Sequence, residues 1–406
     1  GKDRYLARYD FTGRPVQTRE SHSSSASGSQ RGLTTTLAYD HDGRLSQRRT
    51  TLSSVTTPLT ARYSYDEAGG LSEKTLGSTP VSYAYNVRGW IGKIASAPFV
   101  SELRYENPRY GGAPLYSGMV SQWTWKHGQQ PENDYVFSYD GVGRMVAAKH
   151  FVDGARTDGY TERGIRYDAN GNLLSISRTS GGAVSDSLRF TLGGDVLLDV
   201  SGTSTGVFEY DPSGNLVKDG LNRLEFSYNC LNLMQTVQTT VGASKAQFAY
   251  GSDGRKLSEK AGTGGFEYMG SLIYAYRGGT LSLAQAVTDE GTIQSAGVNY
   301  FIRDHLGSVR AVVDHTGKIV ERNDYYPFGG RHENSALSLS ATNRYKFGSK
   351  ESLEPVSLDM LDFGARFYDP LAGIRRTRWR RNTSRFHPIT IAREIPSRWS
   401  IRRGCS

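Results

Sequence analysis

Apolar and polar residues alternate in short runs along most of the chain, and each run leads into a tyrosine. The run consists of an apolar residue, one further residue and then Tyr-Asp or Tyr-Asn, as in Phe226-Ser227-Tyr228-Asn229. Side chains at i and i+2 share one face of a strand, and aromatic residues at this period are typical of strands rather than helices. The residue two before the tyrosine is apolar in every copy: Ala7, Leu37, Tyr63, Tyr83, Phe137, Ile165, Phe208, Phe226 and Phe248.

A tight turn is predicted after each tyrosine pair, which makes each copy a β-hairpin. The Asp or Asn side chain can accept hydrogen bonds from nearby backbone N–H groups and thereby start the turn. In most copies a glycine three residues later can adopt the left-handed backbone that closes a short hairpin loop. The pairs are Tyr9-Asp10, Tyr39-Asp40, Tyr65-Asp66, Tyr85-Asn86, Tyr139-Asp140, Tyr167-Asp168, Tyr210-Asp211 and Tyr228-Asn229.

The spacing of the copies predicts the architecture. Repetition every 20–50 residues or so indicates an array of supersecondary units, and single hairpins are only marginally stable in water, so neighbours must pair. The predicted fold is all-β, with consecutive antiparallel β-hairpins in one long winding sheet. We interpret the tyrosines as structural, with packed rings and hydroxyls in water. The alternative is that their faces stack on sugars, although no polar partner is placed beside a given ring.

Two later segments carry the most specific motifs. One includes Arg303-Asp304-His305-Leu306-Gly307 and Tyr326-Pro327-Phe328-Gly329, and the other ends in Gly364-Ala365-Arg366-Phe367-Tyr368-Asp369-Pro370. With the repeats, these segments closely resemble the RHS/YD-repeat proteins. The resemblance assigns a YD-repeat hairpin array to residues 1–285 and an RHS repeat-associated core to residues 286–373. Its core signature is Asp304, His305, Gly307, Tyr326, Pro327, Gly329, Gly364, Arg366, Tyr368, Asp369 and Pro370.

The resemblance implies a β-strand spiral that forms part of a hollow shell. In that family the shell encloses a C-terminal polypeptide, usually a toxin, which is cleaved just after the core and delivered to a competing cell. The implied partners are this toxin cargo, missing from the chain, and its immunity protein. The implied location is secreted or at the bacterial cell surface. The alternative function is a cell-surface adhesion module that binds glycans through its tyrosines, which would then form an exposed groove instead of facing inward.

No candidate catalytic, cofactor-binding or metal-ligating residue is found. Cys230 and Cys405 give neither a disulfide framework nor a metal-ligand spacing, and no phosphate-binding loop is present. No apolar run approaches the roughly 20 residues that a membrane-spanning helix needs. Asp304-His305 has no assignable nucleophile, so we interpret it as part of a strand–turn–strand. Self-cleaving members of the family are thought to use aspartates after the core, a segment that is replaced here, so we expect neither enzymatic activity nor self-cleavage.

The net charge of +9 belongs to the end of the chain. Residues 375–406 contain ten arginines and one acidic residue, Glu394, whereas the preceding residues carry 39 basic and 39 acidic side chains. Nucleic-acid binding is therefore expected only if this segment is a genuine part of the protein. Because the chain starts at Gly1 without a methionine, we also expect it to be a piece of a longer product with an exposed sheet edge that associates with other copies.

Residues 374–406 are predicted to form an irregular basic tail, and we interpret them as out of frame. The family phrases that follow the core are absent in the given frame. Back-translation of residues 376–402, read from the last base of each codon, permits Asp-Pro-Leu-Ala-Glu-Lys-Tyr and then Tyr-Cys-Ala-Gly-Asn-Pro. Both phrases stand in family order and at family spacing. The alternatives are a genuine basic arm for nucleic acid and a short effector.

Resequencing the coding DNA across residues 365–406 tests the frame interpretation. We expect an inserted or deleted base near residues 371–376 whose correction restores both family phrases. If the DNA stands as translated, the tail is genuine, and binding to nucleic acid becomes the hypothesis to pursue.

Overall fold

The computed structural model describes residues 2–23, 30–333, 343–356, 358–364, 366–371 and 374–376. These residues form a 30-stranded sheet and a second, 4-stranded sheet, and they contain no α-helix. Successive strands of the large sheet pair in an antiparallel manner along almost the whole chain, from β1 with β2 to β29 with β30. The predicted all-β fold of consecutive hairpins is therefore confirmed.

The strands of the large sheet begin and end close to the predicted repeats, and a repeat tyrosine ends β1, β3, β5, β7, β11, β14, β18 and β20. The first ten are β1 (Lys2–Tyr9), β2 (Pro15–Ser23), β3 (Gln30–Tyr39), β4 (Leu45–Leu52), β5 (Leu59–Tyr65), β6 (Leu71–Leu76), β7 (Thr79–Tyr85), β8 (Ile91–Ala95), β9 (Val100–Arg104) and β10 (Gln122–Lys126). The next ten are β11 (Asn133–Tyr139), β12 (Met145–Val152), β13 (Ala155–Arg156), β14 (Glu162–Tyr167), β15 (Leu173–Ser180), β16 (Ala183–Gly193), β17 (Val196–Gly202), β18 (Gly206–Tyr210), β19 (Leu216–Asp219) and β20 (Leu224–Tyr228). The last ten are β21 (Met234–Thr239), β22 (Ser244–Tyr250), β23 (Lys256–Ala261), β24 (Gly264–Met269), β25 (Leu272–Arg277), β26 (Thr280–Thr288), β27 (Gly291–Gln294), β28 (Gly297–Arg303), β29 (Val309–Asp314) and β30 (Ile319–Arg322).

Short elements follow the large sheet. They are the 3₁₀ turns η1 (Phe347–Ser349) and η2 (Glu354–Val356) and the strands β31 (Glu351–Ser352), β32 (Leu361–Asp362), β33 (Phe367–Asp369) and β34 (Ile374–Arg376). The first three residues of the predicted tail thus form β34, which pairs with β33. The rest of the tail, residues 377–406, lies outside the described residues.

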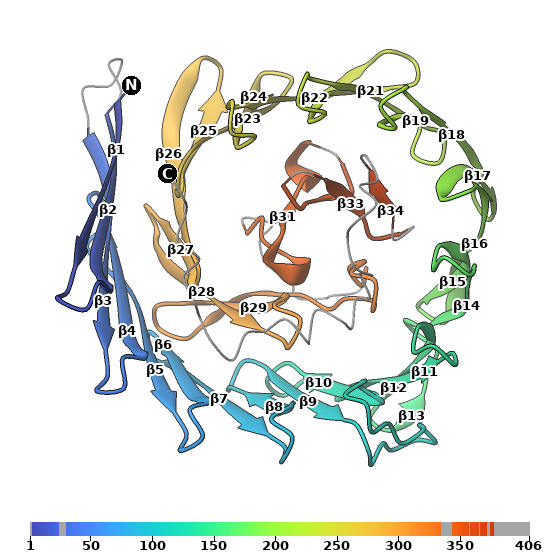
Figure 1. Ribbon diagram of the computed structural model, residues 1–406, viewed down its shortest axis with the longest axis horizontal. Coiled ribbons are helices and arrows are strands. Elements are labelled where there is room, and N and C mark those ends of the chain that lie inside the picture. Colours follow the sequence, from blue (N-terminus) through green and yellow to red (C-terminus); the bar gives the residue numbers. More distant parts are fainter. Residues whose placement is uncertain are drawn as a thin grey trace.

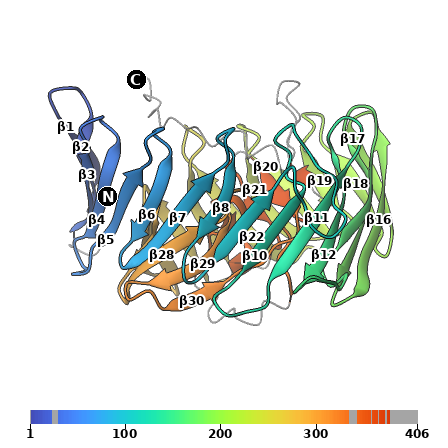
Figure 2. The ribbon, with the colours of Figure 1, turned by 90° about the horizontal axis from the view of Figure 1, so that it is seen from below.

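The large sheet winds into a spiral (Figure 1). Its strands follow one another around a ring, and after one circuit β25–β28 pass on the inner side of β1–β6. Strands β27 and β28 contact β5 across this overlap. The small sheet of β31–β34 lies inside the ring, and the side view shows the strands as a wall around it (Figures 1 and 2). We call β1–β24 the outer wall and residues 272–333 the inner turn. The predicted spiral shell is confirmed.

The repeat turns have the predicted chemistry. In the turn between β3 and β4, Oδ1 of Asp40 accepts hydrogen bonds from the backbone N–H groups of Asp42 and Arg44, at 3.0 and 2.8 Å. Gly43 adopts the left-handed conformation with φ of +80°. Nε of Arg44 donates to Oδ2 of Asp40 at 2.7 Å, and its guanidinium group lies 4.8 Å from the ring centroid of Tyr65 in the next hairpin. This turn therefore also contacts the next hairpin, and the same contact joins Arg14 to Tyr39 and Arg144 to Tyr167.

Hydrogen bonding explains why the carboxylates of these turns stay ionised. The hydroxyl of Thr12 and the backbone N–H of Arg14 donate to Asp10, and they lower the pKa of this carboxyl group to about 2. At Asp140, burial would raise the pKa, but hydrogen bonds from the backbone and side chain of Arg144 outweigh it and lower the pKa.

The expectation that the tyrosine hydroxyls stay in water is wrong. The hydroxyl of Tyr65 donates to the backbone carbonyl of Leu45 in the preceding hairpin at 2.8 Å. The pairing of β4 with β5 starts at Gln47, opposite Arg62, and does not include Leu45. The Tyr65 hydroxyl therefore donates to a carbonyl that has no partner in β5. The same bond recurs around the wall: Tyr39 to Pro15, Tyr85 to Leu71, Tyr105 to Ile91, Tyr139 to Val120, Tyr167 to Met145 and Tyr228 to Leu216.

Removing one of these hydroxyls measures its contribution. We expect Tyr139→Phe to lower the free energy of unfolding by about 1 kcal/mol, because the carbonyl of Val120 loses its donor at 2.7 Å. Tyr116, whose exposed fraction is 65%, provides the control, since Tyr116→Phe removes a hydroxyl from the surface. Urea unfolding followed by tryptophan fluorescence compares the two, and equal effects would contradict a structural role for the hydroxyl.

Candidate functional site

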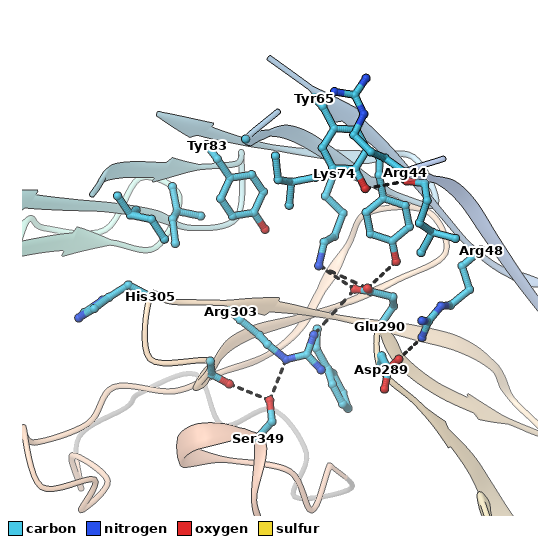
Figure 3. Close-up of a pocket in the computed structure, with 18 of the residues that line it drawn as sticks. Arg44, Arg48, Tyr65, Lys74, Tyr83, Asp289, Glu290, Arg303, His305 and Ser349 are labelled. Atoms are coloured by element: carbon cyan, nitrogen blue, oxygen red, sulfur yellow. Dashed lines mark hydrogen bonds and ion pairs between the residues drawn. The ribbon is translucent and has the colours of Figure 1, made fainter. Parts of the chain in front are cut away.

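A cavity of about 3380 Å³ lies between the outer wall and the inner turn. One side is the inner face of β1–β8, and the other includes residues 301 and 303–307 of the inner turn with Gly348 and Ser349 (Figure 3). The cavity lining is rich in tyrosines, so the repeat tyrosines among them face inward, as a shell requires and an exposed adhesive groove does not. The repeat tyrosines are Tyr9, Tyr39, Tyr63, Tyr65, Tyr83 and Tyr85, and Tyr5 and Tyr105 line the cavity beside them.

Glu290 joins the two sides of this cavity. Its carboxylate accepts hydrogen bonds from the Tyr63 hydroxyl at 2.6 Å and from Nζ of Lys74 at 3.1 Å, and Nη1 of Arg303 lies 3.8 Å away (Figure 3). Burial alone would raise the pKa of Glu290, but the charges of Lys74 and Arg303 and the bonds from Tyr63 and Lys74 lower it to about 2. The ionised carboxylate thus attaches the inner turn to β5 and β6.

Further bonds extend this attachment along the wall. Glu20 of β2 accepts hydrogen bonds from the backbone N–H and hydroxyl of Ser271, at 2.9 and 3.0 Å. Arg48 of β4 pairs with Asp289, and the Tyr300 hydroxyl accepts the backbone N–H of Thr60 at 3.1 Å. Strands β2, β4, β5 and β6 of the outer wall are therefore held by polar contacts to Ser271 and to residues 289–300 of the inner turn.

A buried arginine lies where the inner turn meets β9 and β10. The side chain of Arg310 in β29 has an exposed fraction of 0%. Its guanidinium carbon lies 5.0 to 5.6 Å from the ring centroids of Phe99, Trp123, Trp125 and Tyr325. A desolvated cation over aromatic faces is attracted by the ring quadrupoles. The outer wall thus supplies three rings of a cage, and the inner turn supplies the cation and the fourth ring.

Asp324 balances the charge of Arg310. Its Oδ1 accepts hydrogen bonds from Nη2 of Arg310 and from Nε1 of Trp125 at 2.7 Å, and Nε2 of His127 lies 2.9 Å away. Burial would raise the pKa of Asp324, but His127 and Arg310 hold it well below its usual range. At Asp304, whose Oδ2 lies 3.7 Å from Nη1 of Arg310, burial dominates and raises the pKa to about 6.

Three histidines near this cage are buried and neutral. Burial lowers the pKa of His150 to about 4 and the pKa values of His305 and His332 to about 3. The ring of His332 stacks on Tyr160 with centroids 3.9 Å apart, and its Nε2 lies 2.9 Å from the Tyr135 hydroxyl. These rings join the inner turn to the outer wall through contacts that need uncharged imidazoles.

A second ionic cluster joins β23 of the outer wall to residues 344–362. Nζ of Lys256 in β23 lies 2.7 Å from carboxylate oxygens of both Glu351 and Asp362. Arg344 pairs with Glu259 of the same strand at 2.6 Å. Burial alone would lower the pKa of Lys256, but the neighbouring carboxylates, Glu351 foremost, raise it well above its usual value. The outer wall therefore contacts residues 286–373 both at the Arg310 cage and at this ionic cluster.

The first core motif is a buried copy of the repeat turn. The backbone N–H groups of Leu306 and Ser308 donate to Oδ1 of Asp304, both at 2.9 Å, and the N–H of Asp304 donates to the carbonyl of Ser308 at 3.1 Å. Gly307 adopts φ of +77°, and the ring of His305 packs on Trp123 at 4.8 Å. Asp304 and His305 are thus occupied with the turn and the aromatic cage.

The second motif forms another turn against the wall. Pro327 and Gly329 lie in a turn closed by the backbone N–H of Tyr326, which donates to the carbonyl of Gly330 at 2.7 Å. The Tyr326 hydroxyl donates to the carbonyl of Thr179 in β15 at 2.6 Å.

The last motif packs on this turn. The Tyr368 hydroxyl donates to the carbonyl of Phe328 at 2.7 Å, which joins the two core motifs. Gly364 and Arg366 lie in the turn between β32 and β33, where Gly364 adopts φ of +86° and its N–H donates to Asp362 at 2.6 Å.

Asp369 and Pro370 are anchored to the outer wall. Asp369 is buried, accepts the backbone N–H of Leu371 at 2.8 Å and receives a hydrogen bond from Asn222 at 3.2 Å. Nη2 of Arg178 donates to the carbonyl of Pro370. The last two residues of the core signature are therefore held between β15 and the turn after β19.

The cage residues themselves are missed by the sequence patterns. None of Arg310, Asp324, His127 and His332 was singled out from the sequence. One signal was available: Arg310 is the one charged residue in the apolar run Val309–Val313, which is typical of a buried strand, so its charge requires a buried partner.

Within the described residues, no group of three or more His, Cys, Asp or Glu side chains is placed to hold a metal ion. In the same part of the chain, no helix has the length and apolar character that crossing a bilayer demands.

The buried histidines make stability depend on pH. Below about pH 6.5 the histidines of the unfolded chain bind protons, whereas these three stay neutral until about pH 4 or 3, so the free energy of unfolding falls as the pH drops through this window. Asp304 acts in the opposite direction between about pH 6 and 4, because the folded state holds a proton that the unfolded state has lost.

Substituting His305 tests this assignment. We expect His305→Phe to reduce the slope of unfolding free energy against pH by up to about 1.4 kcal/mol per pH unit between pH 6 and 4, since one proton-binding difference disappears. Urea unfolding at a series of pH values gives the slope. The exposed His41 provides a matched His→Phe substitution, His41→Phe, measured in the same way. An unaltered slope in His305→Phe would show that His305 is not held neutral.

Comparison with known proteins agrees with this architecture. The profile of the teneurin YD-shell family matches residues 116–383. Among curated proteins, none matches the chain. The crystal structure of TcdB2–TccC3 without its hypervariable C-terminal region superposes with a TM-score of 0.64 at 15% identity, over 91% of this chain and 22% of that chain. The Tc holotoxin pore of Photorhabdus luminescens superposes with a TM-score of 0.58 at 14% identity, over 92% of this chain and 22% of that chain.

The chain thus spans about a fifth of the length of these Tc chains, and at such identity the similarity shows the fold. The family match covers more than half of the sequence, including the inner turn and the core motifs. Together with the spiral sheet and the repeat turns, this match shows that the chain belongs to the teneurin YD-shell family of RHS/YD-repeat shell proteins.

Proposed function

We propose that the chain is a non-catalytic shell segment that encloses a C-terminal polypeptide for delivery. The observation that carries the proposal is the course of the chain after the inner turn. Strands β31–β34 lie inside the ring of the large sheet, so a polypeptide joined after β34 starts within the shell (Figure 1). A spiral wall with an occupied centre is suited to holding a chain rather than to converting a small substrate.

The cavity supports this role. Its tyrosines present rings toward the interior, and several of their hydroxyls are bonded to backbone carbonyls of the wall. These rings offer broad apolar contact with hydroxyls that already bond to the wall, which suits contact with many different polypeptide sequences. The matching TcdB2–TccC3 protein has a hypervariable C-terminal region, which fits a shell of constant shape around a variable cargo.

From the resemblance to the RHS/YD-repeat proteins, we further propose that the cargo is a toxin and that the cell that makes it holds a matching immunity protein. We also propose that the shell is secreted or exposed at a bacterial surface during competition between cells. The shell itself performs no chemistry, because Asp304 and Asp369 serve as turn acceptors. The glycan-binding alternative loses its main support, since the repeat tyrosines line the interior.

Site-specific photo-crosslinking tests the enclosure. Thr35 and Thr36 are neighbours on β3, but Thr35 lines the cavity and Thr36 faces outward. Benzoylphenylalanine is placed at either position in the gene product that carries its C-terminal polypeptide. We expect the residue at position 35 to crosslink to the polypeptide that follows the core, as identified by mass spectrometry.

The residue at position 36 is the matched control and should give no such product. Crosslinks to the C-terminal polypeptide from position 36, or none from position 35 in a folded protein, would contradict enclosure. Crosslinks from position 35 only to other parts of the wall would show that the cavity is filled by the shell itself.

A further inference from the structure

The outer face of β1–β5 carries an array of arginines. Alternate residues of these strands, such as Tyr5, Leu37 and Tyr63, line the cavity. Because successive side chains of a strand point to opposite faces, the residues next to them face outward. The array consists of Arg4, Arg8, Arg19, Arg49 and Arg62, all of them exposed.

These charges are not compensated within the described residues. None of the five guanidinium groups forms an ion pair there, and the outward-facing described positions of β1–β5 include no acidic residue. Glu20 of β2 faces inward and is bound to Ser271. Other outward-facing basic residues of the wall include paired ones: Lys218 lies 2.6 Å from Glu209, and Lys260 lies 3.7 Å from Glu267. Arg163, Arg166 and Arg189 are exposed and form no ion pair with described residues. The array of β1–β5 differs from these positions in bringing five such arginines together on neighbouring strands.

The array extends in two dimensions. Arg8 and Arg49 share one cross-strand row, through Gln17 and Thr36. Arg19 lies in the next row on one side, because it pairs with Leu6. Arg62 lies in the next row on the other side, opposite Gln47, and Arg4 lies beyond Arg19. With strands about 4.8 Å apart and same-face residues about 6.8 Å apart, the array measures roughly 20 Å in each direction.

We propose that this outer face docks on the phosphate-bearing surface of an anionic lipid bilayer. Guanidinium groups bind phosphate oxygens in a bidentate manner, and anionic membranes attract clustered basic side chains. A bilayer presents phosphates in two dimensions, as the array does, whereas a linear polyanion such as DNA reaches only those arginines that lie along its path. Leu6, with an exposed fraction of 60%, adds an apolar contact among the charges. The docking is independent of the proposed enclosure.

Binding of the full 406-residue chain to vesicles of phosphatidylcholine and phosphatidylglycerol in equal parts tests the proposal. We expect Arg8→Gln/Arg49→Gln to weaken binding about 25-fold at physiological ionic strength, since each arginine contributes about fivefold. Arg8→Lys/Arg49→Lys should retain most of the affinity because it keeps the charge.

The control Lys218→Gln/Lys260→Gln removes the same charge from another part of the outer face and should leave binding unchanged. The ten arginines between 375 and 406 are present in every variant, so they cannot produce a difference between them. Equal weakening by both pairs, or no effect of Arg8→Gln/Arg49→Gln, would overturn the proposal. Tight binding to a DNA duplex without binding to the vesicles would overturn it as well.

Discussion

The closure of the spiral depends on one buried cation. Arg310 is removed from water, which is costly for a charged group unless a partner and hydrogen bonds replace the solvent. Asp324 supplies the charge, and Phe99, Trp123 and Trp125 of the outer wall supply the aromatic faces. Because the cation belongs to the inner turn and most of its cage to the wall, this contact holds β29 of the inner turn against β9 and β10 of the outer wall.

The outer wall is held together by contacts between neighbouring hairpins. Neighbouring hairpins are joined by strand pairing, by tyrosine hydroxyls on carbonyls of the preceding hairpin and, after three turns, by an arginine over the next tyrosine ring. Such nearest-neighbour contacts build a strip of any length, as in other repeat proteins. They do not by themselves determine where the sheet begins to overlap itself. The contacts of the inner turn with the outer wall determine this overlap, whereas the repeats determine how one hairpin joins the next.

This separation explains what the sequence could predict. The turns were predictable because Asp40 and Gly43 act within five residues, and the strands because their period is local. The acceptor of the Tyr65 hydroxyl was not, because it depends on where strand pairing leaves a carbonyl unused. The cage was missed because Trp125 and Arg310 are distant in sequence, and no local pattern links them. The motif at Asp304–Gly307 was correctly interpreted as a turn, but its burial beside the cage came only from the structure.

Hydrogen exchange in an Arg310→Met variant tests most directly whether this cation closes the spiral. We expect backbone amides of β9–β11 and β28–β30 to lose protection, because the buried carboxylate of Asp324 loses its arginine partner between them. The amides of β20–β24, which are held by repeat contacts on the opposite part of the ring, should keep theirs (Figure 1). Uniform loss of protection, or unchanged protection at β9–β11 and β28–β30, would contradict this expectation.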